Sequence, residues 1–289
     1  MGKLIEKLHA VTQASSGGMG FFARPQAPAH KARPAVVLVA GGAGDLAALK
    51  AAAESGADGV IVTGWRAGAI APAGLAEALK AHEGVWGVEL EAESGGDALK
   101  AAHEQGAAFA ILGAQAPAGA LFFEEIEKFD RVITVEPPRD DLALLTLRAV
   151  NLLPAQAALV RADFTPSGLG KLNISDFTRL QLLWESLRFP SLVTVQGMPD
   201  TAALRLLVQL GADALVVSAA GGTAQALGEQ VKALLTALEN TPARSAGGEG
   251  GSLLAGLLGA TGGGQPATIP GPTPSPRPQP EPAPDPDEE

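Results

Sequence analysis

The motif Gly56-Ala57-Asp58-Gly59-Val60 indicates the fold, because it returns later in the chain, again between a stretch with helical periodicity and an apolar run. It recurs as Gly211-Ala212-Asp213-Ala214-Leu215 and, more loosely, as Gly106-Ala107-Ala108-Phe109. In each copy, a glycine follows a stretch with helical periodicity and precedes an apolar run. Glycine commonly ends a helix in the left-handed conformation, and buried parallel strands are nearly continuous apolar runs. Each copy therefore predicts the end of a helix and the start of a parallel strand.

The region 35–240 repeats this change from helical to apolar pattern. Eight short apolar runs are the expected strands: 35–40, 59–63, 86–90, 107–112, 132–135, 157–160, 192–195 and 214–217. Expected helices between or after them include 46–55, 141–151, 176–188, 201–210 and 225–239, with Asp140, Ser175 and Asp200 as start signals. Eight strand–helix units predict an α/β protein with a (β/α)₈ TIM barrel at 35–240. A doubly wound open sheet is the alternative, but no nucleotide loop follows the first run.

Composition limits the classes of function. The chain has 289 residues, which suits one barrel, and 46% of them are hydrophobic. Its net charge of −10 argues against a protein that binds nucleic acid through phosphate contacts. The absence of cysteine excludes disulfides, thiolate catalysis and cysteine-based metal sites.

Residues 1–34 form a basic segment, expected to be a helix followed by a loop. Leu4, Ile5, Leu8 and Val11 have helical spacing. We expect this helix to pack on the barrel; a surface-seeking membrane anchor and disorder are the alternatives. No secretory pattern and no apolar run of about 18 residues is present, so we expect no transmembrane segment and a cytoplasmic location.

Residues 241–289 form a Gly/Pro-rich acidic tail. Eleven prolines and ten glycines in this segment cannot bury a core, so we expect disorder. A solvated tail is one interpretation, and a proline-rich ligand for a partner protein with an aromatic groove is the other.

Carboxylates are the main candidates for catalysis. The carboxyl ends of barrel strands hold the active sites of this fold, and neither Lys nor His stands at a predicted strand end. Glu89, Glu136 and Asp163 do, and each could act as a general acid or base. Glu91 lies on the same side of its strand as Glu89, which leaves shared binding of a divalent cation as an alternative.

Anion binding is expected at the last units of the barrel. Arg161 could clamp a phosphate or a carboxylate, or form a salt bridge with Asp163 or another neighbour. Barrels commonly bind phosphate with the loops after strands seven and eight and a helix N-terminus. The expected ligands there are Gln196, Gly197, Ser218, Gly221, Gly222 and Thr223. The alternative is a plain glycine turn with Thr223 as the helix N-cap.

The stretch 211–218, followed by Gly221-Gly222, resembles the phosphate-binding segment of FMN-dependent barrels. The nitronate monooxygenase and IMP dehydrogenase-like groups are the most similar, and 193–197 with 201–203 resembles their preceding unit. The resemblance implies a phosphate, or FMN, held by backbone amides near Gly197, Gly221 and Gly222. It covers about 30 residues and lacks the histidine and cysteine that these groups use in catalysis.

Two functions follow. The first is a barrel that binds a phosphorylated small molecule or FMN at the carboxyl ends of its strands, with no reaction specified. The second is a non-catalytic scaffold that acts through the N-terminal arm and the tail. The ligand-binding function would be favoured if an open pocket were lined by Glu89, Glu136, Arg161 and Asp163. The scaffold function would be favoured if apolar side chains filled that end of the barrel.

Overall fold

The structure, a computed structural model, describes residues 2–13, 33–80, 82–123, 126, 128–138, 140–162 and 172–242. The tail beyond residue 242 and most of the expected N-terminal loop lie outside these ranges, so the predictions for both stay predictions.

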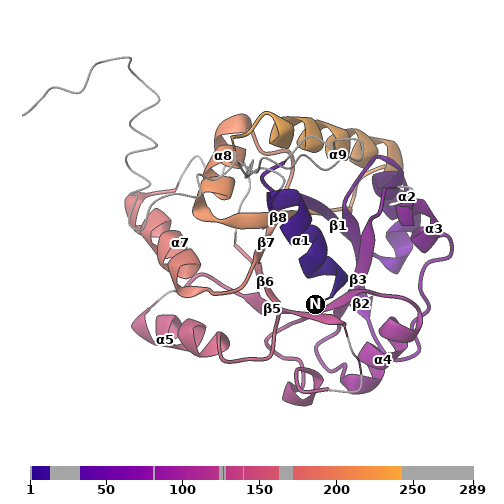
Figure 1. Ribbon diagram of the computed structural model, residues 1–289, viewed down its shortest axis with the longest axis horizontal. Coiled ribbons are helices and arrows are strands. Elements are labelled where there is room, and N and C mark those ends of the chain that lie inside the picture. The colour runs from indigo at the N-terminus through magenta and orange to yellow at the C-terminus, as the bar shows by residue number, and fades with distance from the viewer. Residues whose placement is uncertain are drawn as a thin grey trace, which may run out of the picture. The chain divides into compact units, whose positions relative to one another are not determined.

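Within the described ranges, eight parallel strands close into a barrel in chain order (Figure 1). The strands are β1 (Val36–Gly42), β2 (Gly59–Trp65), β3 (Val85–Leu90), β4 (Phe109–Leu112), β5 (Asp130–Val135), β6 (Ala157–Val160), β7 (Ser191–Val195) and β8 (Ala212–Ser218). Each overlaps the predicted run, and β1 pairs with both β2 and β8. The predicted (β/α)₈ barrel is therefore confirmed, and the open sheet is excluded.

Helices surround the strands (Figure 1). They are α2 (Leu46–Glu54), α3 (Leu75–Lys80), α4 (Gly96–Glu104), α5 (Asp141–Val150), α7 (Ile174–Ser186), α8 (Thr201–Leu210) and α9 (Ala224–Glu239). The fourth unit differs from the predicted repeat, because the described residues between β4 and β5 contain only a 3₁₀ helix, Ala118–Ala120. Pro117 and Gly119 flank and interrupt this short stretch, and both residues disfavour a longer helix.

Side-chain caps mark where α5, α7 and α8 begin. Asp140 accepts a hydrogen bond from the N–H of Ala143, and Asp200 accepts one from Ala203, as predicted. The prediction of Ser175 as a start signal is wrong: Asn173 is the N-cap of α7, with its side chain accepting from the N–H of Asp176. Asparagine caps as well as serine does, so the earlier of the two residues starts the helix.

The recurring motif connects neighbouring strands through hydrogen bonds to its aspartate side chains. Gly56, Gly106 and Gly211 have φ values of 94°, 92° and 118°, the left-handed turn that ends each helix. Asp58, at the start of β2, accepts from the N–H of Val37 at 2.9 Å. Asp213, in β8, accepts from the N–H of Ser191 at 2.8 Å. The aspartates thus satisfy backbone donors of the preceding strand in the barrel, at the amino ends of the strands.

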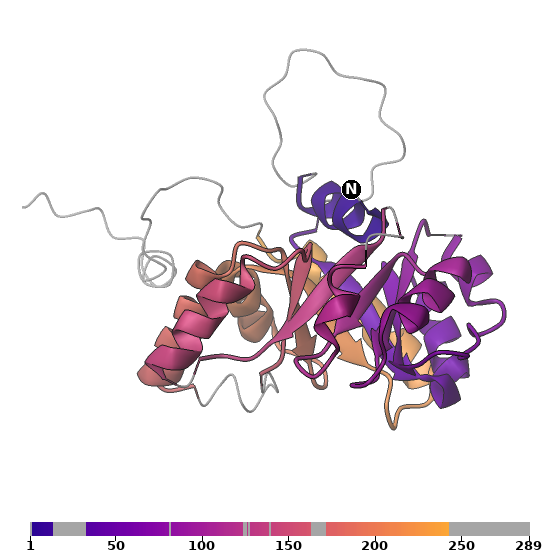
Figure 2. The ribbon, with the colours of Figure 1, turned by 90° about the horizontal axis from the view of Figure 1, so that it is seen from below.

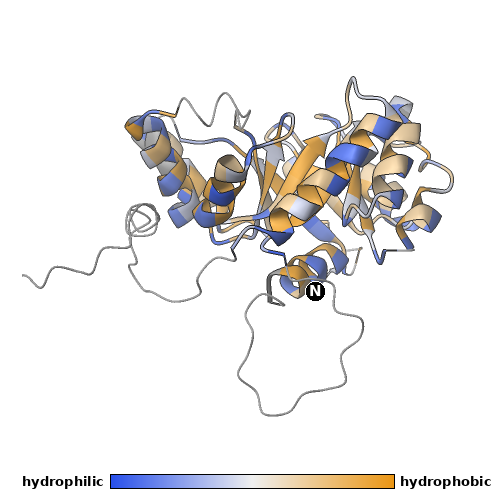
Figure 3. Ribbon diagram, turned by 90° about the horizontal axis from the view of Figure 1, so that it is seen from above, coloured by the Kyte–Doolittle hydropathy of each residue, from blue (hydrophilic) through white to orange (hydrophobic). Residues whose placement is uncertain are grey.

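The barrel interior is apolar from its amino end to its middle. Phe109 is fully buried there, among leucine, isoleucine and valine side chains from the other strands. A Cβ added to Gly87 would lie 2.6 Å from atoms of the Phe109 ring, so the glycine makes room for it. A second apolar cluster lies between the strands and the outer helices, and Figure 3 shows the hydrophobic strands between the amphipathic helices.

The N-terminal helix α1 (Lys3–Gln13) packs across the amino end of the barrel (Figure 2). Leu4, Ile5 and Leu8 are buried against the barrel interior, which confirms the prediction of a helix packed on the body. The Asp130 carboxylate accepts from the N–H groups of Leu4 at 3.0 Å and Ile5 at 3.2 Å. None of the described helices is both long and apolar enough to cross a membrane.

Asp130 links stability to pH. Burial raises the pKa of Asp130 above its ordinary value, while N–H donation from Ile5, Leu4 and Gly2 lowers it by a smaller amount. A carboxyl with a raised pKa holds its proton more tightly in the folded chain. Its contribution to stability is therefore complete below the unfolded pKa of about 3.9 and is lost as the pH rises through the folded value.

We therefore expect the stability difference between the native chain and Asp130→Asn to change with pH. As the pH falls from 7 towards 4, the native chain should gain stability relative to the variant, in which this group does not titrate. Urea unfolding of both proteins at several pH values measures the difference. A constant difference, or a relative loss for the native chain in acid, would contradict the raised pKa.

Candidate functional site

The carboxyl end of the barrel interior is polar, in contrast to the apolar amino end. Alternate residues of a strand point to the same side, so the inward positions continue from the apolar interior into a ring of polar side chains. We call this ring the mouth; it consists of Thr63, Glu89, Thr134, Arg161, Thr194 and Ser218. The mouth lies where active sites of this fold are found.

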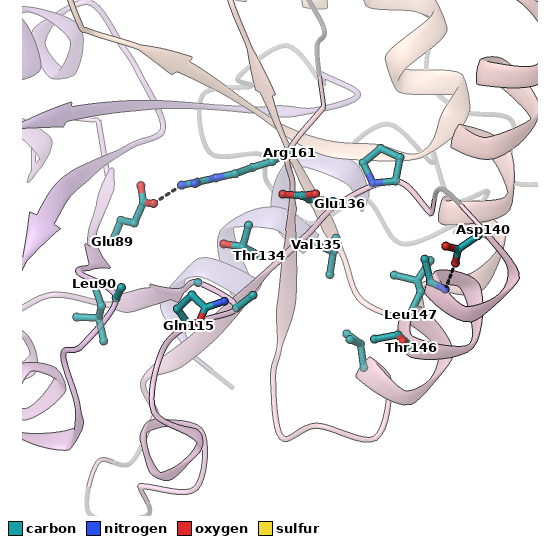
Figure 4. A pocket seen from close by; sticks show the side chains of 16 residues that line it. Glu89, Leu90, Gln115, Thr134, Val135, Glu136, Asp140, Thr146, Leu147 and Arg161 are labelled. Carbon is teal, nitrogen blue, oxygen red and sulfur yellow. Dashed lines mark hydrogen bonds and ion pairs between the residues drawn. The ribbon is translucent and has the colours of Figure 1, made fainter.

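Glu89 and Arg161 form an ion pair across the mouth (Figure 4). Glu89 lies in β3, and Arg161 directly follows β6. The N–H of Arg161 donates to the carbonyl of Val135 at 2.9 Å, which extends the ladder and keeps its side chain on the inner side. The Arg161 side chain is 48% exposed and that of Glu89 is 23% exposed, so the pair faces solvent on one side. The salt bridge expected for Arg161 is therefore made with Glu89.

A cavity of about 810 Å³ opens beside this ion pair. It extends from the mouth between the carboxyl ends of β3 to β6 and helix α5. The apolar lining includes Leu90, Val135, Pro137, Ala143, Leu147 and Val150. The polar lining includes Glu89, Gln115, Thr134, Glu136, Asp140, Thr146 and Arg161. Three predicted site residues, Glu89, Glu136 and Arg161, thus line one open cavity.

Thr134 is the site residue that the sequence analysis missed. Its Oγ1 atom is buried and has no hydrogen-bond partner among the described residues. A buried hydroxyl without a partner costs free energy, and Thr134 is one of the residues that line the cavity. In Figure 4 it lies just below the line between Glu89 and Arg161. Alternation along β5 would have indicated it, because Val132 is an inward residue two positions earlier.

The loops after β7 and β8 lie at the same end of the barrel but do not line this cavity. Gly197 and Gly221 have φ values of 74° and 76°, and a Cβ added to either would meet nothing within 4 Å. Gln196, Ser218 and Gly222 are exposed. The backbone at Gly197 and Gly221 is therefore open to a ligand, whereas the N–H of Gly222 donates to the Ala219 carbonyl at 3.3 Å.

Hydroxyl groups of these loops already take part in turns. Thr223 Oγ1 accepts from the N–H of Ala226 at 3.2 Å and caps α9, as the plain-turn interpretation predicts. Ser218 Oγ accepts from the N–H of Ala220 at 3.3 Å. Each hydroxyl can still donate its hydrogen to an anion.

The two remaining predicted carboxylates are Asp163 and Glu91. Asp163 lies outside the described residues. Glu91 follows the end of β3 and is exposed, while Glu89 is paired with Arg161. Within the ranges that the structure describes, no group of three His, Asp or Glu side chains is arranged to hold a metal ion.

Comparisons with known proteins find similarity in structure only. No protein-family model matches the chain, and no curated protein matches its sequence. Tryptophan synthase from M. tuberculosis is similar with 14% identity and a TM-score of 0.54, over 82% of this chain and 99% of that one. The tryptophan synthase α-subunit from Pyrococcus furiosus has 15% identity and a TM-score of 0.50, over 71% and 99%.

Thiamine phosphate pyrophosphorylase from Pyrococcus furiosus has 16% identity and a TM-score of 0.49, over 72% of this chain and 97% of that one. The similarity to tryptophan synthase supports the sequence resemblance only at the level of the barrel fold. At these identities the similarity to tryptophan synthase shows the architecture alone: the chain folds as a (β/α)₈ barrel.

Proposed function

We propose that this barrel binds a phosphorylated small molecule, with FMN as one candidate, at the carboxyl ends of its strands. The observation that carries the proposal is the open cavity of about 810 Å³ beside the Glu89–Arg161 pair. Ligand pockets of proteins have volumes of about 300 to 1,000 Å³, with mostly apolar walls and a few polar groups. An open cavity with this lining favours ligand binding over a scaffold whose barrel end is filled with apolar side chains.

In this proposal, the phosphate lies on the loops after β7 and β8. Backbone N–H groups near Gly197, Gly221 and Gly222 would donate to it, together with Gln196, Ser218 and Thr223. The open backbone at Gly197 and Gly221 supports this placement, as does the start of α9 directly after the second loop, because a helix N-terminus attracts anions.

The remaining groups of the ligand lie toward the cavity. Arg161 holds an anionic group of the ligand, and Glu89, Glu136 and Asp163 supply general acids and bases if a reaction takes place. The proposal includes a cytoplasmic location and a protein partner for the tail, both of which rest on the sequence.

An absorption spectrum of the purified protein, with mass spectrometry of what heat releases, tests the proposal directly. A yellow protein that releases FMN would support the flavin, and a colourless one that releases a phosphorylated metabolite would support the phosphate without redox chemistry. A colourless protein that releases nothing and whose melting is unchanged by phosphate would contradict the proposal.

Gly222→Val tests where the phosphate binds. A Cβ at Gly222 would meet only the Ala219 carbonyl oxygen, at 3.8 Å, so the fold accommodates a side chain that blocks approach to the loop. We expect inorganic phosphate to bind the variant at least tenfold more weakly, measured by calorimetry at constant ionic strength. Gly119→Val is the matched control, because Gly119 is also exposed and a Cβ there meets nothing within 4 Å. Equal phosphate affinity in both variants would exclude this loop.

A further inference from the structure

We propose that the cavity beside the mouth binds an α-amino acid group with an apolar side chain. Its carboxylate would bind Arg161, and its ammonium would bind Glu89 and Thr134. This inference rests on the proposed function for the location of the ligand at the mouth. It adds the chemical class of the part of the ligand that lies in the cavity.

The charges of the cavity favour a zwitterion over a simple anion. The described lining carries one cationic side chain, Arg161, and three carboxylates, Glu89, Glu136 and Asp140. An anion that took Arg161 would leave the Glu89 carboxylate, which is only 23% exposed, without its partner. Losing one member of a partly buried ion pair is costly because the remaining charge stays desolvated.

A simple cation meets the converse problem, because it would displace Arg161 from Glu89. A zwitterion avoids both costs. Inserted between the two side chains, it replaces one ion pair with two and leaves the net charge of the site unchanged. The exposed fraction of the Arg161 side chain, 48%, gives the guanidinium room to move aside.

Thr134 supplies an acceptor that the ion pair does not need. An ammonium group has three donors, and Glu89 alone does not satisfy them. Thr134 lines the cavity, and its Oγ1 atom is buried and has no hydrogen-bond partner among the described residues. Thr134 lies in β5 and Glu89 in β3, with β4 between them, and both residues line the cavity that the ammonium would enter. Ammonium binding would thus satisfy the buried hydroxyl.

The cavity wall then selects the side chain. Leu90, Val135, Leu147 and Val150 line the same cavity as the ion pair. A hydrophobic side chain that enters there leaves water for apolar contacts, at about 25 cal/mol per Å² of buried area. The cavity, at about 810 Å³, has room for an aromatic side chain.

Three compounds with one carbon skeleton test the inference on the native chain. L-Phenylalanine carries both charges, 3-phenylpropanoate lacks the ammonium, and 2-phenylethylamine lacks the carboxylate. We expect calorimetry to show at least tenfold tighter binding of L-phenylalanine than of either analogue. Equal affinity for L-phenylalanine and 3-phenylpropanoate would overturn the inference, and so would no detectable binding of L-phenylalanine at millimolar concentration.

Glu89→Gln should abolish the preference for L-phenylalanine over 3-phenylpropanoate. The variant keeps the shape of the side chain but removes the charge that the ammonium binds, and it frees Arg161 for a carboxylate. We expect its affinity for 3-phenylpropanoate to rise at least tenfold and its preference for L-phenylalanine to disappear. Glu104→Gln is the matched control, since Glu104 is exposed at the end of α4, and should keep the native preference. An unchanged preference in Glu89→Gln would contradict the role of the carboxylate.

The Gly222→Val variant separates this inference from the proposed function. Free L-phenylalanine carries no phosphate, so we expect the variant to bind it as the native chain does. Phosphate binding without amino-acid binding would overturn this inference alone. Amino-acid binding without phosphate binding would overturn the phosphate site alone.

Discussion

Phe109→Ala should lower the free energy of unfolding by about 3 to 5 kcal/mol, the usual cost of removing a buried phenylalanine ring. Phe109 is fully buried in the barrel interior, at the start of β4. Its ring occupies the space that Gly87 leaves, so the cavity created would face a backbone without a side chain. Strands of a closed barrel cannot move together to fill that space, which puts the expected loss in the upper part of the range.

Urea unfolding followed by circular dichroism measures this loss. Phe122→Ala is the matched control, because the Phe122 side chain is 62% exposed. An exposed substitution of this kind usually changes stability by less than about 0.5 kcal/mol. Equal losses for the two variants would show that the Phe109 ring is not packed as described.

Asp58→Ala should cost about 3 kcal/mol or more, because removing one member of a buried ion pair leaves the other charge unpaired. Asp58 is only 3% exposed and contacts Arg33 at 2.8 Å and Lys7 of α1 at 3.7 Å. It also accepts the N–H of Val37 at 2.9 Å. The variant thus loses a cap of β1 and an attachment of α1 together.

Thermal and urea unfolding of Asp58→Ala, compared with Asp176→Ala, test this expectation. The Asp176 side chain is 44% exposed and lies 4.0 Å from Arg179. Exposed pairs contribute about 0 to 1 kcal/mol, so the control should be close to the native chain. Similar stability of the two variants would mean that the contacts of Asp58 contribute no more than a surface pair does.

The barrel could be predicted from the sequence because its strands are buried on both faces. Such strands appear as separate apolar runs, and glycines such as Gly56 and Gly211 mark the helix ends between them. The fourth unit could not be predicted as well. A helical unit was expected there, and the described residues form only the 3₁₀ helix Ala118–Ala120, since the expectation came from the repeat and not from that segment's own residues.

The sequence predicts which residues lie at the candidate site, but it does not predict which of them form an ion pair. Strand ends identified Glu89, Glu136 and Arg161, which line one cavity. The sequence could not show that Arg161 meets Glu89, because 72 positions separate them and only closure of the barrel brings them together. Thr134 carries no charge, so its residue type does not indicate a site, and only its inward position in the strand alternation marks it.

The barrel has an apolar, tightly packed amino end and a polar, open carboxyl end, and this difference affects how the protein can change over evolutionary time. Buried contacts such as those of Asp58 and Phe109 lie toward the amino ends of the strands, whereas Glu89 and Arg161 lie at the carboxyl ends. Mutations at the carboxyl ends can therefore alter what is bound while the protein still folds and accumulates. The amino ends tolerate fewer changes, so sequence drift should be slow there and new specificities should arise at the opposite end.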